Sequence, residues 1–246
     1  AGGSTREPTR ATVDRVRELT GRPVAQHLTC VGASREEIDA QARELWSAGV
    51  RKLVALRGDP PSGERYAPRH DGYAFAVDLV AGLRRIADFD IAVAAYPETH
   101  PEAKSAEADV DNLKRKLDAG ATSAITQYAF DTDGVLRFVD RARAAGITAP
   151  IIPGIMPVSH FGKLKRFSDA CGAVIPRWLA ETFDGLDDEP ETRDMVAAVV
   201  AAEQCRRLAD AGLTEFHIYT LNKAALSAAI CRALGLTERA ALGAAA

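Results

Sequence analysis

The sequence predicts an α/β protein in which parallel strands alternate with helices and close into a (βα)8 TIM barrel. Short runs rich in β-branched residues alternate with helical patterns, and parallel pairing needs such long crossovers. No GxGxxG motif follows any run, so the usual mark of an open dinucleotide-binding sheet is missing. Polar residues gather where strands are expected to end, as in a barrel active site. These residues are His27, Arg57, Asp59, Tyr96, Gln127 and Asn222.

Six strands and the helices between them are predicted in order along the chain. The strands are expected at Val24–Cys30, Lys52–Gly58, Ile91–Pro97, Ser123–Phe130, Ala149–Ile155 and Glu215–Leu221. After the first strand, Ser34 and Glu37 form a capping box that starts a helix. Helices are expected to end at glycines in the left-handed conformation, namely Gly49, Gly120, Gly146, Gly212 and Gly235. The longest helix spans Glu191 to Ala211, with Met195, Val199, Ala202 and Leu208 as its expected buried stripe.

Composition excludes several classes of protein. The 246 residues are 47% hydrophobic and 26% charged, the proportions of a folded globular protein rather than a disordered one. The net charge is −3 without a basic cluster, which argues against a nucleic-acid partner. No apolar run is long enough to cross a membrane, and no signal peptide opens the chain. The four cysteines have neither CxxC nor zinc spacing, so we expect no metal site, reduced thiols and a cytoplasmic location.

The number of strands does not match a closed barrel. Six strands would leave two open edges where a barrel has eight strands and none. We therefore expect residues 1–246 to form one catalytic barrel domain that lacks its first two strands. The strand expected before the helix near Arg6 is the most obvious absence.

Eight segments resemble the 5,10-methylenetetrahydrofolate reductase family, in family order and over nearly the whole chain. They are HLTC at 27–30, LVALRGD at 53–59, AAYPETHPEA at 94–103, DVDNLKRK at 109–116, AITQ at 124–127, IPGIMP at 152–157, FDGL at 183–186 and FHIYTLN at 216–222. The resemblance implies a (βα)8 barrel that uses FAD and NADH or NADPH. The implied reaction reduces 5,10-methylenetetrahydrofolate to 5-methyltetrahydrofolate by ping-pong hydride transfer, in a homo-oligomer. It also implies two strands before Ala1, the first carrying a proposed proton-donor glutamate.

The resemblance assigns roles to particular residues. Asp59 is implied as the catalytic carboxylate that stabilises a cationic iminium of the folate. The implied substrate contacts are Asp59, Gln127, Lys163, Phe167 and Lys223. The implied FAD contacts are His27, Arg57, Gly58, Asp59, Ala76, Ala94, Tyr96, His100, Ala103, Asp109, Asn112, Arg115 and Lys116. Two positions depart from bacterial relatives, because Lys163 replaces a glutamine and Lys223 an arginine. Lysine lacks the bidentate fork of arginine, which leaves the affinity for the glutamate tail open.

Residue patterns alone allow plainer interpretations of the same positions. Arg57-Gly58-Asp59 also fits a surface turn with a solvated ion pair, and lone histidines such as His27 and His100 are usually structural. The stripe of Asp109, Asn112 and Lys116, with Arg115 beside it, also fits a solvated helix face. Phe167 would by default be core.

Two other functions stay open from the sequence. One is a flavin-free, tetrahydrofolate-dependent methyltransferase, and the other is a non-catalytic folate- or flavin-binding barrel. Retained His27, Arg57, Asn112 and Arg115 favour a flavin enzyme over the first. The choice between NADH and NADPH is open.

Overall fold

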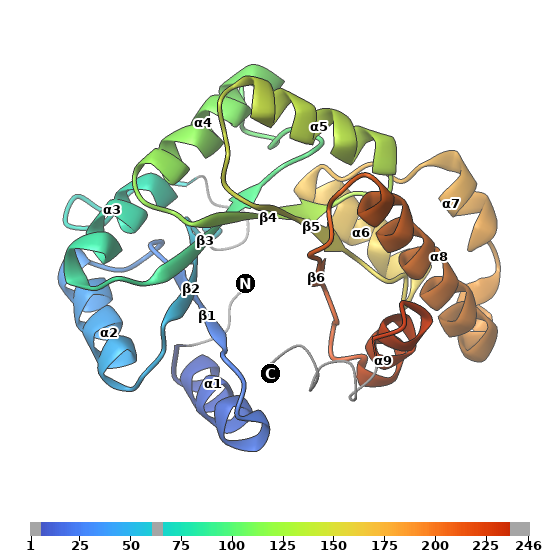
Figure 1. Cartoon of the computed structure of the whole chain (residues 1–246), viewed down its shortest axis with the longest axis horizontal. Coiled ribbons are helices and arrows are strands. Elements are labelled where there is room, and N and C mark those ends of the chain that lie inside the picture. The colour runs from blue at the N-terminus through green and yellow to red at the C-terminus, as the bar shows by residue number, and fades with distance from the viewer. Residues whose placement is uncertain (1–5, 61–65, 237–246) are drawn as a thin grey trace. The chain divides into compact units, whose positions relative to one another are not determined.

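The computed structural model describes residues 6–60 and 66–236, in which six strands follow one another in the order β1-β2-β3-β4-β5-β6 (Figure 1). These residues fall into two compact units. Unit 1 comprises Ala1–Ala95, Asp111–Ala124 and Ile147–Pro150, and unit 2 comprises Tyr96–Val110, Ile125–Gly146 and Ile151–Ala246. Strand order that follows chain order, with a helix after each strand, is the connectivity of a (βα) barrel.

Unit 1 is built on three parallel strands, β1 (Ala25–Thr29), β2 (Lys52–Leu56) and β3 (Asp90–Ala95). The register pairs His27 with Val54, and Val54 with Ala92. Helices α2 (Arg35–Ser47) and α3 (Ala76–Ile86) lie along one side of these strands in Figure 1, and α1 (Arg6–Thr20) packs on β1. The core between them is aliphatic, with Ile38, Leu45, Leu53, Leu79, Leu83 and Ile91 fully buried.

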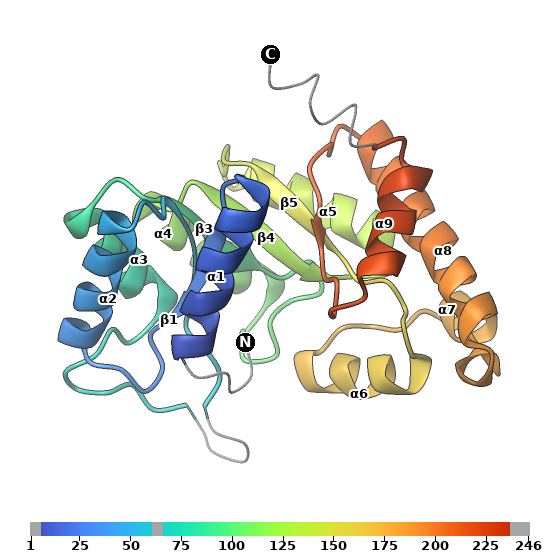
Figure 2. The same cartoon turned by 90° about the horizontal axis from the view of Figure 1, so that it is seen from below.

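Unit 2 holds β5 (Ile151–Ile155), parallel to the short β6 (His217–Ile218), and most of the later helices. These are α5 (Thr132–Ala144), α6 (Phe161–Cys171), α7 (Arg177–Thr182), the 3-10 turn η1 (Leu186–Asp188), α8 (Pro190–Asp210) and α9 (Ala224–Ala233). Its core contains Ile155, Leu179, Phe183, Leu208 and Ile230. Figure 2 shows α6 as a separate helix beside the pair α8 and α9.

The chain crosses between the units in β4 (Ser123–Tyr128) and α4 (Ala106–Asp118). Burial alternates along β3 and β4, because side chains of a strand point to opposite faces in turn. On β3, Ile91, Val93 and Ala95 are buried, whereas Ala92 and Ala94 are only partly covered. On β4, Gln127 lies on the partly covered face. The side chains of Ala94 and Gln127 are therefore partly accessible, each on its own strand.

Several sequence predictions are confirmed in these elements. Ser34 and Glu37 form the capping box of α2, and Ser34 Oγ accepts the Glu37 N–H. The five predicted helix-ending glycines all have positive φ, from 78° at Gly235 to 116° at Gly120. The longest helix is α8. Both strands expected before Ala1 and the single-domain organisation stay predictions.

Two sequence predictions about unit 2 are wrong. The last strand is only two residues long, because the residues around it form loops. The predicted buried stripe of α8 also fails at Met195 and Val199, which are 64% and 66% exposed, although Ala202 and Leu208 are buried. Apolar residues occur all around α8, so the spacing did not identify the face that packs inward.

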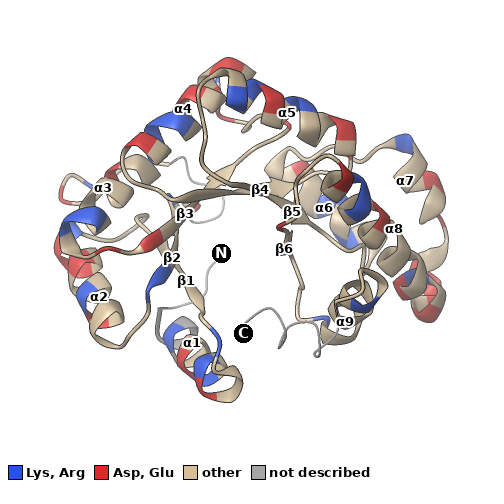
Figure 3. Cartoon of the chain, viewed as in Figure 1, with Lys and Arg blue, Asp and Glu red and all other residues tan. Residues whose placement is uncertain are grey.

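Charged side chains of both signs are distributed over the helices, while the strands carry few (Figure 3). Among residues 6–60 and 66–236, no helix is both long and apolar enough to span a bilayer.

Candidate functional site

The turn after β2 places Arg57, Gly58 and Asp59 at the end of the strand. Gly58 has φ 83°, and a Cβ atom there would lie 2.5 Å from Cγ1 of Val31. Only glycine fits such a left-handed, crowded position. The Arg57 carbonyl accepts the Val31 N–H at 2.8 Å, so the turn is tied to the end of β1. Asp59, two residues beyond the fixed carbonyl, is exposed and can approach a ligand.

Tyr66 holds the Arg57 side chain. The Arg57 guanidinium carbon lies 4.5 Å from the centre of the Tyr66 ring, a cation–π contact. The Tyr66 hydroxyl donates to the carbonyl of Ala74, just before α3, whose first residue is Ala76. Sequence reasoning missed Tyr66, because it lies in a loop without periodicity and no motif includes it.

His27, Ala94 and the basic residues of α4 belong to unit 1. The sequence predicts His27 at the end of a strand, and this is wrong: His27 lies within β1. Its side chain is exposed. Lys116 is only 6% exposed, and its ammonium donates to the carbonyl of Ala94 at 2.5 Å. Arg115 is exposed and donates to the Asn112 side chain at 3.1 Å. Lys116 is therefore not part of a solvated helix face. Its ammonium links α4 to β3 through the Ala94 carbonyl.

The loop after β3 organises Tyr96, His100, Ala103 and Asp109. The edge of the Tyr96 ring meets the His100 ring at a centroid distance of 4.6 Å. The Asp109 carboxylate accepts the His100 backbone N–H at 2.8 Å, and Ala103 N–H donates to the His100 carbonyl. His100 Nδ1 accepts the Glu102 N–H at 3.0 Å. A neutral His100 therefore carries its proton on Nε2.

The same loop is tied to the segment after α6. The Glu98 carboxylate accepts the backbone N–H of Val174 at 2.9 Å, and burial raises the pKa of Glu98. Thr99 beside it has φ 70°, a left-handed conformation that a β-branched residue rarely adopts. Backbone strain of this kind is often found at ligand sites. Neither residue was singled out from the sequence.

Gln127 and helix α6 present polar and aromatic groups in unit 2. The Gln127 side-chain oxygen accepts the Tyr128 N–H at 3.1 Å, which directs its NH2 group away from that contact. Helix α6 buries Phe161, Leu164 and Ser168. Its opposite face exposes Lys163 and Phe167, and Phe167 is 53% exposed. The plain expectation that Phe167 is core is therefore wrong.

Lys223 directly precedes α9, where it is the N-cap residue and is exposed. The two residues before it, Leu221 and Asn222, have φ of 47° and 59°. The Lys223 N–H donates to the Thr220 carbonyl at 2.8 Å, which closes this tight turn. The turn explains why Lys223 projects from the end of the β6 loop.

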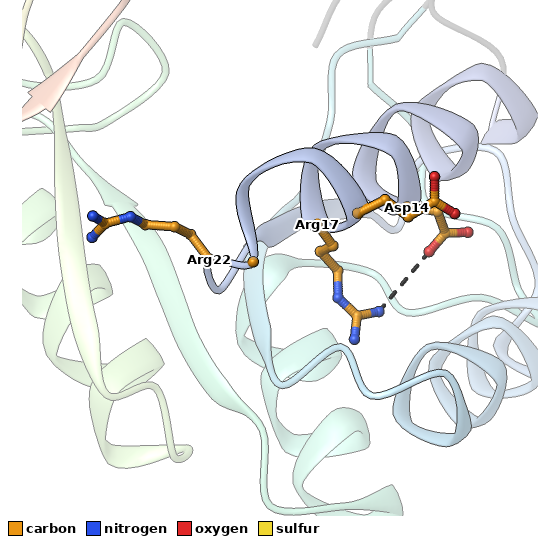
Figure 4. Close-up of a pocket in the computed structure, with 5 residues that line it drawn as sticks. Asp14, Arg17 and Arg22 are labelled. Atoms are coloured by element: carbon orange, nitrogen blue, oxygen red, sulfur yellow. Dashed lines mark ion pairs between the residues drawn. The ribbon is translucent and has the colours of Figure 1, made fainter. Parts of the chain in front are cut away.

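A cavity of about 480 Å³ lies at the C-terminal end of α1 (Figure 4). Its lining residues are Asp14, Arg17, Glu18, Gly21 and Arg22, and an Arg17–Asp14 ion pair of 4.0 Å crosses it. None of the residues that the sequence assigned to a site lines this cavity. Asp14, Arg17 and Glu18 belong to α1, and Gly21 and Arg22 directly follow it, so the lining is largely charged.

The fold and these strand-end side chains define an α/β enzyme of the parallel, barrel-type class. The family model for methylenetetrahydrofolate reductase matches residues 1–235. The chain is 49% identical to 5,10-methylenetetrahydrofolate reductase of Escherichia coli K12, over 96% of this chain and 78% of the relative. It is 36% identical to methylenetetrahydrofolate reductase (NADH) 1 of Zea mays, over 97% of this chain and 42% of the relative. The chain therefore belongs to the methylenetetrahydrofolate reductase family.

One solved structure shares the fold at low sequence identity. It is described as an uncharacterized protein from Clostridium thermocellum that binds two copies of 5-methyl-5,6,7,8-tetrahydrofolic acid. The TM-score is 0.51 with 15% identity, over 96% of this chain and 90% of that one. This likeness supports the barrel-type fold alone.

Proposed function

We propose that this protein is a flavin-dependent reductase that converts 5,10-methylenetetrahydrofolate into 5-methyltetrahydrofolate with NADH or NADPH. The observation that carries the proposal is the 49% identity to the Escherichia coli reductase over 96% of the chain. The reductase name of that relative supports the reaction. The proposed cofactor and substrate contacts all lie in the described part of the chain, and Lys116 is the only one of them that is buried, which supports a ligand site rather than a purely structural set.

The donor set fits FAD, whose diphosphate carries negative charge. Arg57 and Arg115 supply guanidinium groups, which bind phosphate oxygens in a fork. Asn112, His27 and the Nε2–H of His100 add neutral hydrogen-bonding groups. The small side chains of Ala76, Ala94 and Ala103 leave room for a planar ring system near the backbone. Lys116 acts through its neighbour, because its ammonium is already bound to the Ala94 carbonyl.

Bound FAD would supply the hydride chemistry, accepting from NADH or NADPH and donating to the folate in a ping-pong cycle. The protein's residues would orient the substrate and stabilise its charge. Asp59, exposed after the fixed Gly58 turn, would face the cationic iminium that forms when the folate ring opens. Gln127 would donate its NH2 group to the pterin.

Helix α6 and the β6 loop would receive the rest of the substrate. Phe167 offers an exposed ring on which the folate, and then the nicotinamide, can stack. Lys163 and Lys223 supply cations for the carboxylates of the glutamate tail. We expect the active protein to be a homo-oligomer, which light scattering on the purified protein would test.

An anaerobic titration followed by visible absorption tests this proposal. The purified protein should show a bound-flavin spectrum that bleaches when NADH is added and returns when methylenetetrahydrofolate is added. NADPH is titrated in parallel to establish the preference. A colourless protein that takes up no added FAD would overturn the proposal and leave a folate-binding or methyl-transferring barrel.

A further inference from the structure

The first turn of α6 is held by a carboxylate from a distant part of unit 2. Asp187, in η1, accepts the backbone N–H of Phe161 at 2.7 Å and that of Gly162 at 2.8 Å. These are the first two residues of α6, whose N–H groups have no partner within the helix. His160 Nδ1 lies 2.9 Å from the same carboxylate. One side chain therefore fixes where this helix begins.

Asp187 is itself held in place. Arg193 of α8, only 8% exposed, donates to the Asp187 backbone carbonyl at 3.4 Å. The Phe161 and Phe183 rings stack at a centroid distance of 6.2 Å, which packs the start of α6 against the segment before η1. A Cβ atom on Gly162 would lie 3.4 Å from Asp187 Oδ2, so helix and carboxylate are in close contact.

The same helix is fixed further along by its buried face. Ser168 Oγ and the Tyr128 hydroxyl lie 3.1 Å apart, which links α6 to β4 next to Gln127. The exposed face between these two attachments carries Lys163 and Phe167, four residues apart and thus neighbours on the helix. Lys163 directly follows the two N–H groups that Asp187 binds. A shift of the first turn would therefore move Lys163 more than Phe167.

We propose that Asp187 is a positioning residue for the folate: it fixes the first turn of α6 so that Lys163 and Phe167 meet the substrate together. This inference rests on the proposed function, because that function places the folate on α6. Asp187 touches neither substrate nor cofactor. Its effect should therefore appear mainly in folate binding, which uses both Lys163 and Phe167, and far less in the reaction with NADH, which uses Phe167 but not Lys163.

The test compares Asp187→Ala and Asp187→Asn with Asp188→Ala, an exposed neighbour in the same turn that provides the matched control. Calorimetry measures the Kd for 5-methyltetrahydrofolate, and stopped-flow absorption measures flavin reduction by NADH without folate. In Asp187→Ala the Kd should rise about tenfold, or about 1.4 kcal/mol, while the rate of flavin reduction should change far less. Asp187→Asn should fall between, since an amide oxygen can still accept one of the N–H groups. Asp188→Ala should match the unmodified protein.

Two results would overturn the inference. One is a Kd in Asp187→Ala equal to that of Asp188→Ala. The other is a parallel loss of folate binding and flavin reduction in the folded Asp187→Asn variant, which would indicate a general structural role. If Asp187→Ala does not fold, Asp187→Asn decides between these outcomes.

Phe167→Ala separates this inference from the proposed function. If Phe167→Ala weakens folate binding and the Asp187 variants do not, the inference alone fails. If Phe167→Ala leaves the Kd unchanged, the folate does not lie on α6, and the substrate assignment fails with it.

Discussion

Helices α4 and α6 both carry basic residues that we propose as ligand contacts, but the surroundings of these residues differ. On α4, Lys116 is buried on the Ala94 carbonyl and Arg115 is bonded to Asn112. On α6, Lys163 is exposed and the phenylalanine four residues later is 53% exposed. The basic groups of α4 thus take part in internal contacts, whereas α6 exposes Lys163 and Phe167.

The difference agrees with the roles that the proposed function gives to each region. A tightly held cofactor benefits from groups that are fixed beforehand, since less freedom is lost on binding. A helix that receives two substrates in turn needs an accessible surface that either can cover. The position of the α6 backbone, rather than its side chains, is what the protein fixes, through Asp187 at one end and Ser168 further along.

The largest effect on stability should come from the fixed region, at Gly58. Gly58→Ala combines a left-handed backbone with a contact of 2.5 Å to Val31, and we expect a loss of about 3 kcal/mol in the free energy of unfolding. Gly146→Ala is the control, because Gly146 has φ 82° with no atom within 4 Å of the added Cβ. It should lose about 1 kcal/mol from backbone strain alone. Equal losses in urea unfolding would show that Val31 gives way and that the turn is not tightly packed.

The next effect concerns catalysis at the edge of that fixed turn. Asp59→Asn should slow reoxidation of the flavin by methylenetetrahydrofolate about 100-fold, the usual result of removing one charge-stabilising group. Reduction by NADH should change far less, because no folate cation is present in that step. Stopped-flow absorption measures both steps. Equal slowing of flavin reduction and flavin reoxidation would contradict the role of Asp59 in stabilising the iminium. Asp118→Asn, at the exposed end of α4, serves as the control.

The sequence predicts the order of the strands, the helix ends and the polar loops after β2 and β3, because local rules determine these features. The capping box at Ser34 and the glycines at helix ends are local rules, so they can be identified without tertiary contacts. The polar positions after β2 and β3 follow from the alternation of strands and helices. The family resemblance then predicts that Arg57 and His100 bind a cofactor, and this stays a prediction.

The remaining features depend on contacts between distant residues. Asp187 lies 26 residues from Phe161, and Tyr66 meets Arg57 only because the loop after β2 returns to the strand. The burial of Lys116 could not be predicted from a stripe that looks like a solvated helix face. The prediction that Met195 and Val199 of α8 are buried failed for the same reason. Packing against distant residues decides which apolar face of a helix is covered.

A smaller effect is expected where α4 meets β3. Lys116→Met keeps the length of the side chain but removes the donor to the Ala94 carbonyl, so we expect a loss of about 2 kcal/mol in unfolding free energy. The Kd for FAD should rise about tenfold, because Ala94 loses its fixed position. Lys114→Met is the control, since Lys114 forms an i,i+4 pair with Asp118 at 3.0 Å and contacts no strand carbonyl among the hydrogen bonds of the described residues. Tight FAD binding in a destabilised Lys116→Met would contradict the positioning role.

The smallest effect is the pH dependence of the α6 attachment. Burial raises the pKa of Asp187, but the hydrogen bonds from Gly162 and Phe161, with His160 and Arg193 nearby, lower it by more, so the pKa lies below the ordinary value of an aspartate. A lowered pKa in the folded state means that the charged carboxylate stabilises the fold above the unfolded pKa. That contribution is lost as the pH falls through the folded value.

The difference in unfolding free energy between the protein and Asp187→Asn should therefore be constant from neutral pH down to about pH 5. It should shrink as the solution becomes more acidic. Urea unfolding at a series of pH values measures this difference, and Asp188→Asn should show no such trend. A difference that grows toward acid pH would mean that the neutral carboxyl holds α6, and the exposed substrate helix would then not depend on an ionised anchor.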